Sequence, residues 1–396
     1  MNNSNANSAL INTLNASDSR HNPAVYSSKK IYPASAMNLL GLDLSTGTFA
    51  NNQTITYNLN KYGILQSLNF VYEKTDSAGG TYSEFDFMTV IDRVELLSSS
   101  RVIQTLTNHD ILAQCKDLDM GQFEVVNGTM LKTRSGTATQ SFSVPLVFGF
   151  MKDINTNLNL QFNEPMSVRI KLKSEIKQPA PATTTVGASP KLFMRYLAYN
   201  ESDYAEVLAQ NYDEPEFNQM VTNFYDEPTV SELVSAAQVT AGLKTMTVDL
   251  KNTECVNNFY VIVHKQVADT AGFGDPIEVT SIKLKASGQT LYEATGAMVF
   301  SGSLCENGYY RSIPDESSID HIAKIGLGYW EYAGGGTQSN TLSLRELNNP
   351  QIEVTFLTGS FAAGGTETAE VIVCEETLGI VSTTSSTGRV QAALSN

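Results

Sequence analysis

The chain has 396 residues, about two to three times the size of a typical domain, so we expect two domains. A formal net charge of −15 disfavours direct nucleic-acid binding, because counterion release needs clustered Lys and Arg. Charged residues make up 17% and hydrophobic residues 41% of the sequence, which excludes disorder. The chain therefore has a large core under an uncharged polar surface. Such a surface fits either an ordinary Thr-rich β protein or extensive contact with other protein.

Alternating apolar and polar residues dominate the chain and predict many short β-strands. Gly- and Ser-containing turns separate them, which is typical of sandwiches and barrels rather than of α/β units. The expected strands are Thr54–Leu59, Leu65–Tyr72, Val90–Leu97, Met166–Leu172, Lys191–Tyr199, Met246–Leu250, Phe259–His264, Val279–Leu284, Ile352–Phe356 and Ala369–Cys374.

Helical patterns are few and short. Asn108–Leu118 begins with an Asn cap and places Ile111, Leu112 and other apolar residues on one face. Ser231–Val239 and Ser317–Lys324 have weaker helical patterns. We expect all three to be loop helices rather than core elements.

An internal duplication organises the sequence, because five blocks recur in the same order in both halves. Identities between the blocks are few, but their apolar positions and turns correspond. Half-length units with about eight strands suit a jelly roll, a two-sheet sandwich built from Greek keys. The paired blocks are Ile55–Leu59 with Met246–Leu250, Leu68–Lys74 with Phe259–Lys265, Val94–Ile103 with Ile282–Leu291, Leu158–Pro165 with Leu342–Pro350, and Lys191–Ser202 with Thr368–Thr377.

The duplication predicts an all-β chain of two consecutive eight-stranded jelly rolls, with a few short loop helices and terminal arms. Both termini are polar and of low complexity, so we expect arms that are disordered or become ordered on a partner. The N-terminal arm is mildly basic, in contrast to the acidic body. The expected boundaries are an N-terminal arm at 1–50, a first jelly roll at 51–207, a linker at 208–240, a second jelly roll at 241–382 and a C-terminal tail at 383–396.

The segment Asn340–Phe356, NTLSLRELNNPQIEVTF, resembles part of the second jelly roll of double jelly-roll major capsid proteins. These proteins form the shells of tailless icosahedral viruses, including tectivirus-like bacteriophages and adenovirus. The shared pattern is a strand, a polar-Arg step, Asn-Pro and an alternating strand. The chain departs from it at Leu342 and Leu344, and the first-half counterpart, Asn163–Pro165, lacks the Arg. The matching positions are Arg345, Asn348, Asn349 and Pro350.

The resemblance implies a structural protein that assembles as pseudo-hexagonal homotrimers into an icosahedral shell around a genome. The implied location is the virion, after synthesis in the host cytoplasm. The implied partners are further copies of the chain, vertex and minor capsid proteins, and internal membrane lipid contacted by the N-terminal arm, without sequence-specific nucleic acid. It implies no enzyme activity, catalytic residue, cofactor or metal. The long loops that suit towers or trimer clasps are Thr75–Glu84, Gln114–Gln140, Ala268–Ile277 and Phe300–Gly336.

The residue types that carry chemistry show no catalytic spacing. The four histidines are His21, His109, His264 and His321, and none lies in an HExxH or HxH motif. The four cysteines lack CxxC spacing, so we expect free thiols in a reducing compartment. No signal peptide or membrane-spanning run is visible. One acidic group offers cation ligands but is better explained as a solvated helix face; it consists of His109, Asp110, Asp117 and Asp119.

Two glycine motifs and one aromatic group remain. Gly272–Asp275 and Gly326–Gly328 lack the strand-to-helix context of a phosphate-binding loop, so we interpret both as turns. Trp330, beside Tyr329 and Tyr332, is either a stacking platform or a core or interface anchor. An alternative function is a secreted carbohydrate-active enzyme or lectin on a double β-sandwich. Its paired carboxylates would stand about 5–9 Å apart, and the sequence leaves that open.

Overall fold

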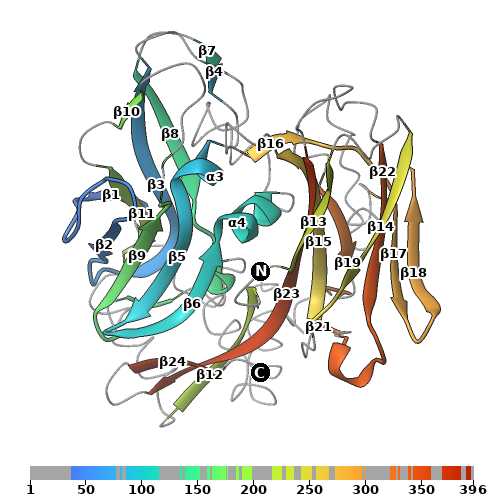
Figure 1. Ribbon diagram of the computed structural model, residues 1–396. Coiled ribbons are helices and arrows are strands. Elements are labelled where there is room, and N and C mark those ends of the chain that lie inside the picture. The colour runs from blue at the N-terminus through green and yellow to red at the C-terminus, as the bar shows by residue number, and fades with distance from the viewer. Residues whose placement is uncertain are drawn as a thin grey trace, which may run out of the picture.

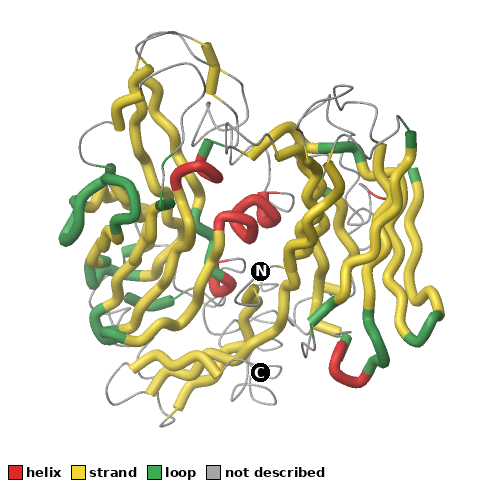
Figure 2. Tube along the Cα trace, in the orientation of Figure 1, coloured by secondary structure: helices red, strands yellow, loops and turns green. Residues whose placement is uncertain are grey.

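Two β-sandwiches stand side by side in the computed structural model, with their long strands running in roughly the same direction (Figure 1). Figure 2 shows that strands make up most of the described chain and that its helices are short. The structure describes residues 37–76, 81–82, 86–115, 134–135, 139–151, 158–160, 163–174, 176, 184–186, 190–198, 216–224, 229–235, 242–251, 256–266, 273–296, 299, 322–326, 329–330, 338–339, 342–357, 368–384 and 389–393.

The first sandwich consists of a 5-stranded and a 4-stranded antiparallel sheet. The first sheet has the order β1-β11-β3-β10, with β8 also paired to β3, and the second has the order β2-β9-β5-β6. Its strands are β1 (Met37–Leu42), β2 (Thr54–Asn58), β3 (Ile64–Asp76), β5 (Ile91–Ser98), β6 (Arg101–Thr107), β8 (Thr139–Pro145), β9 (Met166–Leu172), β10 (Thr184–Val186) and β11 (Lys191–Leu197).

The second sandwich consists of a 7-stranded and a 4-stranded sheet. In the larger sheet β23 pairs with β12, β13, β15 and β24, and β15 pairs with β16 and β19. The smaller sheet has the order β14-β22-β17-β18. The strands are β12 (Glu216–Phe224), β13 (Thr229–Ser235), β14 (Leu243–Asp249), β15 (Val256–Gln266), β16 (Phe273–Pro276), β17 (Val279–Ala286), β18 (Gln289–Thr295), β19 (Ala323–Gly326), β22 (Gln351–Leu357), β23 (Thr368–Thr384) and β24 (Arg389–Ala393).

Short elements complete the described chain. Two small ribbons pair β4 with β7 and β20 with β21. The elements are β4 (Thr81–Tyr82), β7 (Arg134–Ser135), β20 (Tyr329–Trp330), β21 (Gln338–Ser339), the helices α3 (Phe87–Val90) and α4 (Asn108–Cys115), and the 3-10 helices η1 (Gly149–Met151) and η4 (Leu344–Glu346).

The two sandwiches have the same strand order, which confirms the internal duplication. The order β1-β11-β3-β8 in the first corresponds to β13-β23-β15-β19 in the second, and β2-β9-β5-β6 corresponds to β14-β22-β17-β18. Each of the five block pairs falls on corresponding strands or on the segment that leads into β9 or β22. The predicted fold class, two consecutive jelly rolls, is therefore confirmed.

The duplication extends to individual backbone contacts at one turn. Ser99 and Ser287, between the last two strands of the smaller sheets, have φ of 54° and 51°. The backbone N–H of Ser99 donates to Pro165 O at 2.8 Å, and that of Ser287 donates to Asn348 O at 2.8 Å. In both halves the same turn is therefore held by the segment just before β9 or β22.

A cross-strand ion pair also recurs, with its charges reversed. Glu95 on β5 lies opposite Arg169 on β9, and the two side chains form a salt bridge. At the corresponding register Lys283 on β17 lies opposite Glu353 on β22, with Nζ 3.9 Å from the carboxylate. The opposite signs leave the attraction unchanged, so the duplicated sheets keep the pair although the residues differ.

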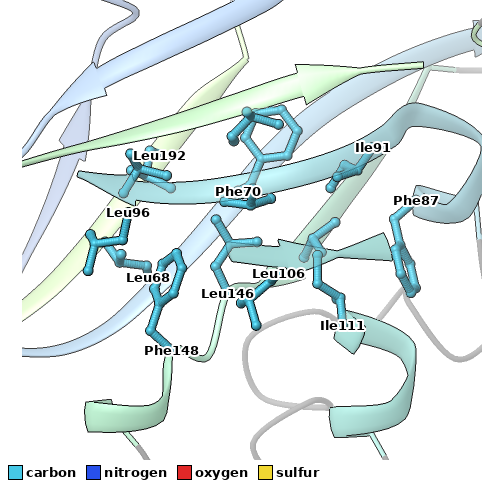
Figure 3. Close-up of a cluster of buried hydrophobic side chains, with 14 of the residues drawn as sticks. Leu68, Phe70, Phe87, Ile91, Leu96, Leu106, Ile111, Leu146, Phe148 and Leu192 are labelled. Carbon is cyan, nitrogen blue, oxygen red and sulfur yellow. The ribbon is translucent and has the colours of Figure 1, made fainter. Parts of the chain in front are cut away.

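Strand alternation builds the core. In β9 Met166, Val168, Ile170 and Leu172 are buried, and the residues between them are partly exposed. Figure 3 shows part of the resulting cluster, in which Phe70 and Leu192 from one sheet lie near Leu96 and Leu106 from the other. Such burial contributes about 25 cal/mol per Å² of apolar surface removed from water.

Several elements differ from the sequence predictions. Thr229–Ser235 is strand β13, so the predicted helix at Ser231–Val239 is wrong over its described part. Lys324 lies in β19, not in a helix. Both predictions were based on weak helical patterns, and hydrogen bonding to a neighbouring strand outweighs such local preferences. The helix predicted at Asn108–Leu118 is confirmed over Asn108–Cys115, and its last three residues lie outside the described residues.

Strands also occupy segments that we expected to be arms or a linker. β1 lies within residues 1–50 and pairs along its whole length with β11. β12 and β13 lie within 208–240, and β24 lies within 383–396. Each pairs with a neighbouring strand, which satisfies its backbone hydrogen bonds, and Leu42 on β1 and Val390 on β24 are also buried.

Gly63 tests the connection into β3. Its φ is +53°, and a Cβ there would lie 1.7 Å from the Leu197 carbonyl oxygen. We expect Gly63→Ala to lower the free energy of unfolding by more than about 4 kcal/mol, measured by chemical denaturation. Gly296→Ala is the matched control, because Gly296 has φ +58° with nothing within 4 Å of its Cβ. That control should lose only about 1 kcal/mol, and equal losses would contradict the steric explanation.

Candidate functional site: the contact between the two sandwiches

The two sandwiches meet along a contact formed by α4, β6 and η1 on one side and by the larger sheet of the second sandwich on the other (Figure 1). α4 lies against β15 and β23. The far end of β23 extends beyond its own sandwich, where it pairs with β12 and β24. This three-stranded ribbon lies against β5, β6 and η1 of the first sandwich. We call the whole region the inter-sandwich contact.

The inter-sandwich contact has an apolar layer that continues the core of the first sandwich. One cluster of buried side chains runs from Leu106 on β6 through Ile111 and Leu112 on α4 into the second sandwich. The side chains that the second sandwich contributes are Tyr260, Ile262, Ile322, Ile372, Cys374, Val381 and Val390. A separate cluster fills the interior of the second sandwich. The larger sheet of the second sandwich is therefore buried on both faces.

Strand β23 reflects this double burial in its sequence. Residues 371–377 are buried without interruption, unlike the alternating pattern of β9. Val371 and Val373 belong to the inner cluster, whereas Ile372 and Cys374 belong to the inter-sandwich contact. Within this stretch Val371–Cys374 is a continuous apolar run, the expected signature of a strand covered on both faces.

Polar groups at the start of α4 are buried in the same contact. Asp110 Oδ2 accepts hydrogen bonds from Thr107 N at 2.8 Å and from Thr107 Oγ1 at 2.7 Å. Burial, together with the neighbouring Asp110 carboxylate, raises the pKa of the Cys374 thiol well above its usual value. Cys374 therefore remains a protonated thiol inside the contact.

Two histidines, His109 and His264, lie at the inter-sandwich contact and interact electrostatically. His264 Nε2 on β15 lies 2.9 Å from Glu370 Oε2 on β23. Burial, and then the charges of Lys173 and His264, lower the pKa of His109 to about 4. Glu370 has the opposite effect on His109, but burial outweighs it. His109 is therefore neutral at neutral pH.

A second polar group links β15 to the following part of β23. Glu376 is 1% exposed, and its carboxylate accepts hydrogen bonds from Asn258 Nδ2 and, at 3.4 Å, from Tyr260 Oη. Lys324 Nζ lies 5.5 Å from the centroid of the Tyr260 ring, in cation–π geometry. These groups satisfy one another and serve packing and register.

The structure brings His109 and His264, both singled out in the sequence, to the inter-sandwich contact, and it places Asp110 beside Cys374 there. His21, His321, Asp117 and Asp119 lie outside the described residues, and so does Tyr332. Within the residues described, no group of three or more His, Cys, Asp or Glu side chains is arranged to hold a metal ion. In the same residues, no helix is long and apolar enough to cross a membrane.

The glycine and aromatic motifs take simple structural positions. Phe273–Pro276 forms β16, so most of the first glycine motif is strand rather than the predicted turn. Gly326 ends β19, and the rest of that motif lies outside the described residues. Tyr329 and Trp330 form β20, paired with β21.

The segment that carries the family resemblance leads into β22. Arg345 lies in η4, Asn349 has φ 53°, and Pro350 O accepts a hydrogen bond of 2.9 Å from Leu250 N. Asn is one of the few residues that tolerate this left-handed backbone, which explains an Asn before the proline. In the first half Glu164 fills the corresponding place and pairs with Arg101.

Comparisons with known proteins agree with this architecture. No protein-family model matches the sequence, and no curated protein does. A chain of the PBCV-1 virus capsid is 14% identical, with a TM-score of 0.63 over 93% of this chain and 99% of that one. The mavirus major capsid protein is 11% identical, with a TM-score of 0.56 over 92% and 91% of the two chains. The Faustovirus major capsid protein is also 11% identical, with a TM-score of 0.55 over 89% and 91%.

These similarities extend over both sandwiches. At such identities they establish the fold, which is the double jelly roll found in viral major capsid proteins. The resemblance inferred from Asn340–Phe356 and from the duplication is therefore confirmed at the level of fold.

Val390 on β24 tests the ribbon of the inter-sandwich contact. Its side chain is fully buried, so we expect Val390→Ala to lower the free energy of unfolding by about 2 kcal/mol. Val102→Ala is the control, because Val102 lies on β6 but is 44% exposed. It should change stability by less than about 0.5 kcal/mol in the same denaturation assay. Similar losses of unfolding free energy in both variants would show that burial of Val390 against the first sandwich does not stabilise the fold.

His109 makes stability depend on pH. In the unfolded chain its pKa is near 6.5 and in the folded chain about 4, so the unfolded state binds more protons between these values. Folding stability therefore falls as the pH drops from 6.5 towards 4, by about 1–3 kcal/mol from this group. We expect His109→Gln, which does not titrate, to lose less stability over this window in parallel denaturation curves. Identical pH profiles would contradict this assignment.

Proposed function

We propose that the chain is a major capsid protein, a structural subunit of an icosahedral virus shell, and not an enzyme. The observation that carries the proposal is the match in fold to the PBCV-1 virus capsid chain over 99% of that chain's length. A match of this extent covers both sandwiches and their relative placement. It therefore supports the same structural role for the whole chain and not for one sandwich alone. We further propose that it acts in the virion after synthesis in the host cytoplasm.

Self-association is the mechanism of the proposed function. Two jelly rolls joined by a buried contact give one rigid block, and three such blocks give a pseudo-hexagonal homotrimer. Shell stability then comes from many modest contacts repeated by symmetry. The low charged fraction of 17% fits a chain with extensive protein contacts, because charge is depleted at the centres of interfaces.

The mass in solution tests the proposed assembly. We expect light scattering of the purified chain to give three times 43.1 kDa at micromolar concentration. Electron microscopy of the same sample should show blocks with a pseudo-hexagonal outline. A monodisperse monomer with a native β-type circular dichroism spectrum would contradict the trimer.

The mildly basic N-terminal arm is proposed to lie beneath the shell, against acidic neighbours or internal membrane lipid. Vertex and minor capsid proteins are the other proposed partners.

Deleting residues 2–20 tests the role of the arm. The deletion should leave the trimer and its melting temperature unchanged, because neither core loses a residue, while closed shells become fragile or fail to form. Particles of normal size and heat resistance would show that the arm is dispensable, and loss of the trimer would place the arm within it.

A further inference from the structure

A buried polar cluster lies in the first sandwich, where β3 and α3 meet. Lys74, near the end of β3, is fully buried, and Asp86, immediately before α3, is 4% exposed. Lys74 Nζ lies 2.8 Å from Asp86 Oδ1 and 3.2 Å from Thr89 Oγ1. Tyr72 Oη donates a hydrogen bond of 2.8 Å to the other carboxylate oxygen, Asp86 Oδ2.

Aromatic rings pack against the Tyr72 ring of this cluster. The Tyr72 ring stacks on Phe142 with centroids 5.2 Å apart, and its centroid lies 5.6 Å from that of Phe70 and 5.9 Å from that of Phe49. A full charge pair is costly in such apolar surroundings. Burial also raises the pKa of Tyr72 well above its usual value, so its phenol stays protonated and remains a hydrogen-bond donor.

The Lys74–Asp86 pair differs from the other lysine–carboxylate pairs of the described chain. In those pairs the lysine side chain is between 29% and 51% exposed, as in Lys285–Glu353 at 29% and Lys191–Asp43 at 51%. Water therefore reaches those groups. Only for Lys74 and Asp86, among the described pairs, are both groups removed from water and held at contact distance.

We propose that Lys74 and Asp86 condense after folding to form an intramolecular isopeptide bond. Lys74 Nζ forms a bond to Asp86 Cγ, and the Cγ–Oδ1 bond breaks. Oδ1 leaves as water with two of the three ammonium protons, and the third proton stays on the amide nitrogen. Atoms and charges balance, and the step needs no oxidant, cofactor or other reactant.

The neighbouring hydroxyls are placed to promote this condensation. Charge develops on Oδ2 as Nζ attacks Cγ, and the Tyr72 hydroxyl already donates to that oxygen. Thr89 Oγ1 accepts an N–H of Lys74 and is itself fixed by donating to Asp86 O at 2.7 Å. Holding the two groups in contact replaces a bimolecular encounter, an advantage equivalent to about 10⁵ M or more.

The product suits the site better than the ion pair does. The amide oxygen keeps the hydrogen bond from Tyr72, and the amide N–H keeps its bond to Thr89. The buried charges disappear, so their desolvation cost disappears as well. The bond closes the segment between β3 and α3, whose linked residues are 12 positions apart, and thereby fixes the loop at one end of the sandwich.

Mass spectrometry of the denatured full chain tests the proposal. Proteolysis after glutamate cuts after Glu73, Glu84 and Glu95, and so separates Lys74–Glu84 from Phe85–Glu95. We expect these two peptides to remain joined, with the mass of their sum less one water. Two separate peptides of full mass, from folded protein incubated for days, would overturn the proposal.

Variants separate bond formation from folding. Tyr72→Phe keeps the ring and removes the donor, so the joined peptide should form at least tenfold more slowly. Tyr57→Phe is the matched control, because Tyr57 is a buried tyrosine of the same sandwich whose Oη donates to Pro190 O at 2.7 Å. It should give the joined peptide at the wild-type rate. Equal rates in the two variants would remove Tyr72 from the mechanism.

A paired replacement guards against misfolding as an explanation. In the double variant Lys74→Met with Asp86→Leu, both polar partners are replaced by apolar groups, which leaves no unpaired buried charge. We expect this variant to fold, with a native circular dichroism spectrum, and to give two separate peptides. Joined peptides from the double variant would mean that the link lies elsewhere, and the proposal would be wrong.

Discussion

Burial of both faces of one sheet is the constraint on which the arrangement of this chain depends. A β-sheet that covers its own sandwich normally leaves its outer face to water. Here the outer face of the sheet around β23 carries Ile372, Cys374 and Val381, and these side chains need a second layer. The first sandwich supplies that layer through α4 and β6. The two jelly rolls are therefore not independent domains on a linker, because separating them would expose a continuous apolar surface.

The inter-sandwich contact joins different parts of the two duplicated units. Both sandwiches have the same strand order. The first contributes α4, β6 and η1 to the contact, whereas the second contributes its larger sheet and the ribbon of β23, β12 and β24. The repeated features, such as the turns at Ser99 and Ser287, lie within each sandwich.

Much of the fold was predictable from the sequence, because strand alternation is a local signal. β9 was predicted with its observed bounds, Met166–Leu172, since its four apolar residues alternate without a break. The strands β12 and β24 were not predicted, because their structure depends on pairing with β23 and, for β24, on burial of Val390 in the inter-sandwich contact. At the candidate site, the sequence analysis noted His109 and His264 separately. Their proximity could not be predicted, because it depends on how the two sandwiches pack against each other. Lys74 and Asp86 carried no signal, since burial of a lysine at the end of an alternating strand is a property of the folded core.

Rigidity connects these features to the proposed function. A shell built from many copies needs subunits whose contact surfaces keep fixed relative positions, because ordering a flexible subunit costs free energy at every contact. In this chain the inter-sandwich contact fixes one jelly roll on the other, and charged groups within it, such as Glu376, are hydrogen-bonded and so favour one register. An isopeptide bond between Lys74 and Asp86 would extend the same principle from packing to covalent structure, at the loop between β3 and α3. Non-covalent packing sets the position of each sandwich, and the proposed covalent link would add a fixed connection between the end of β3 and the start of α3.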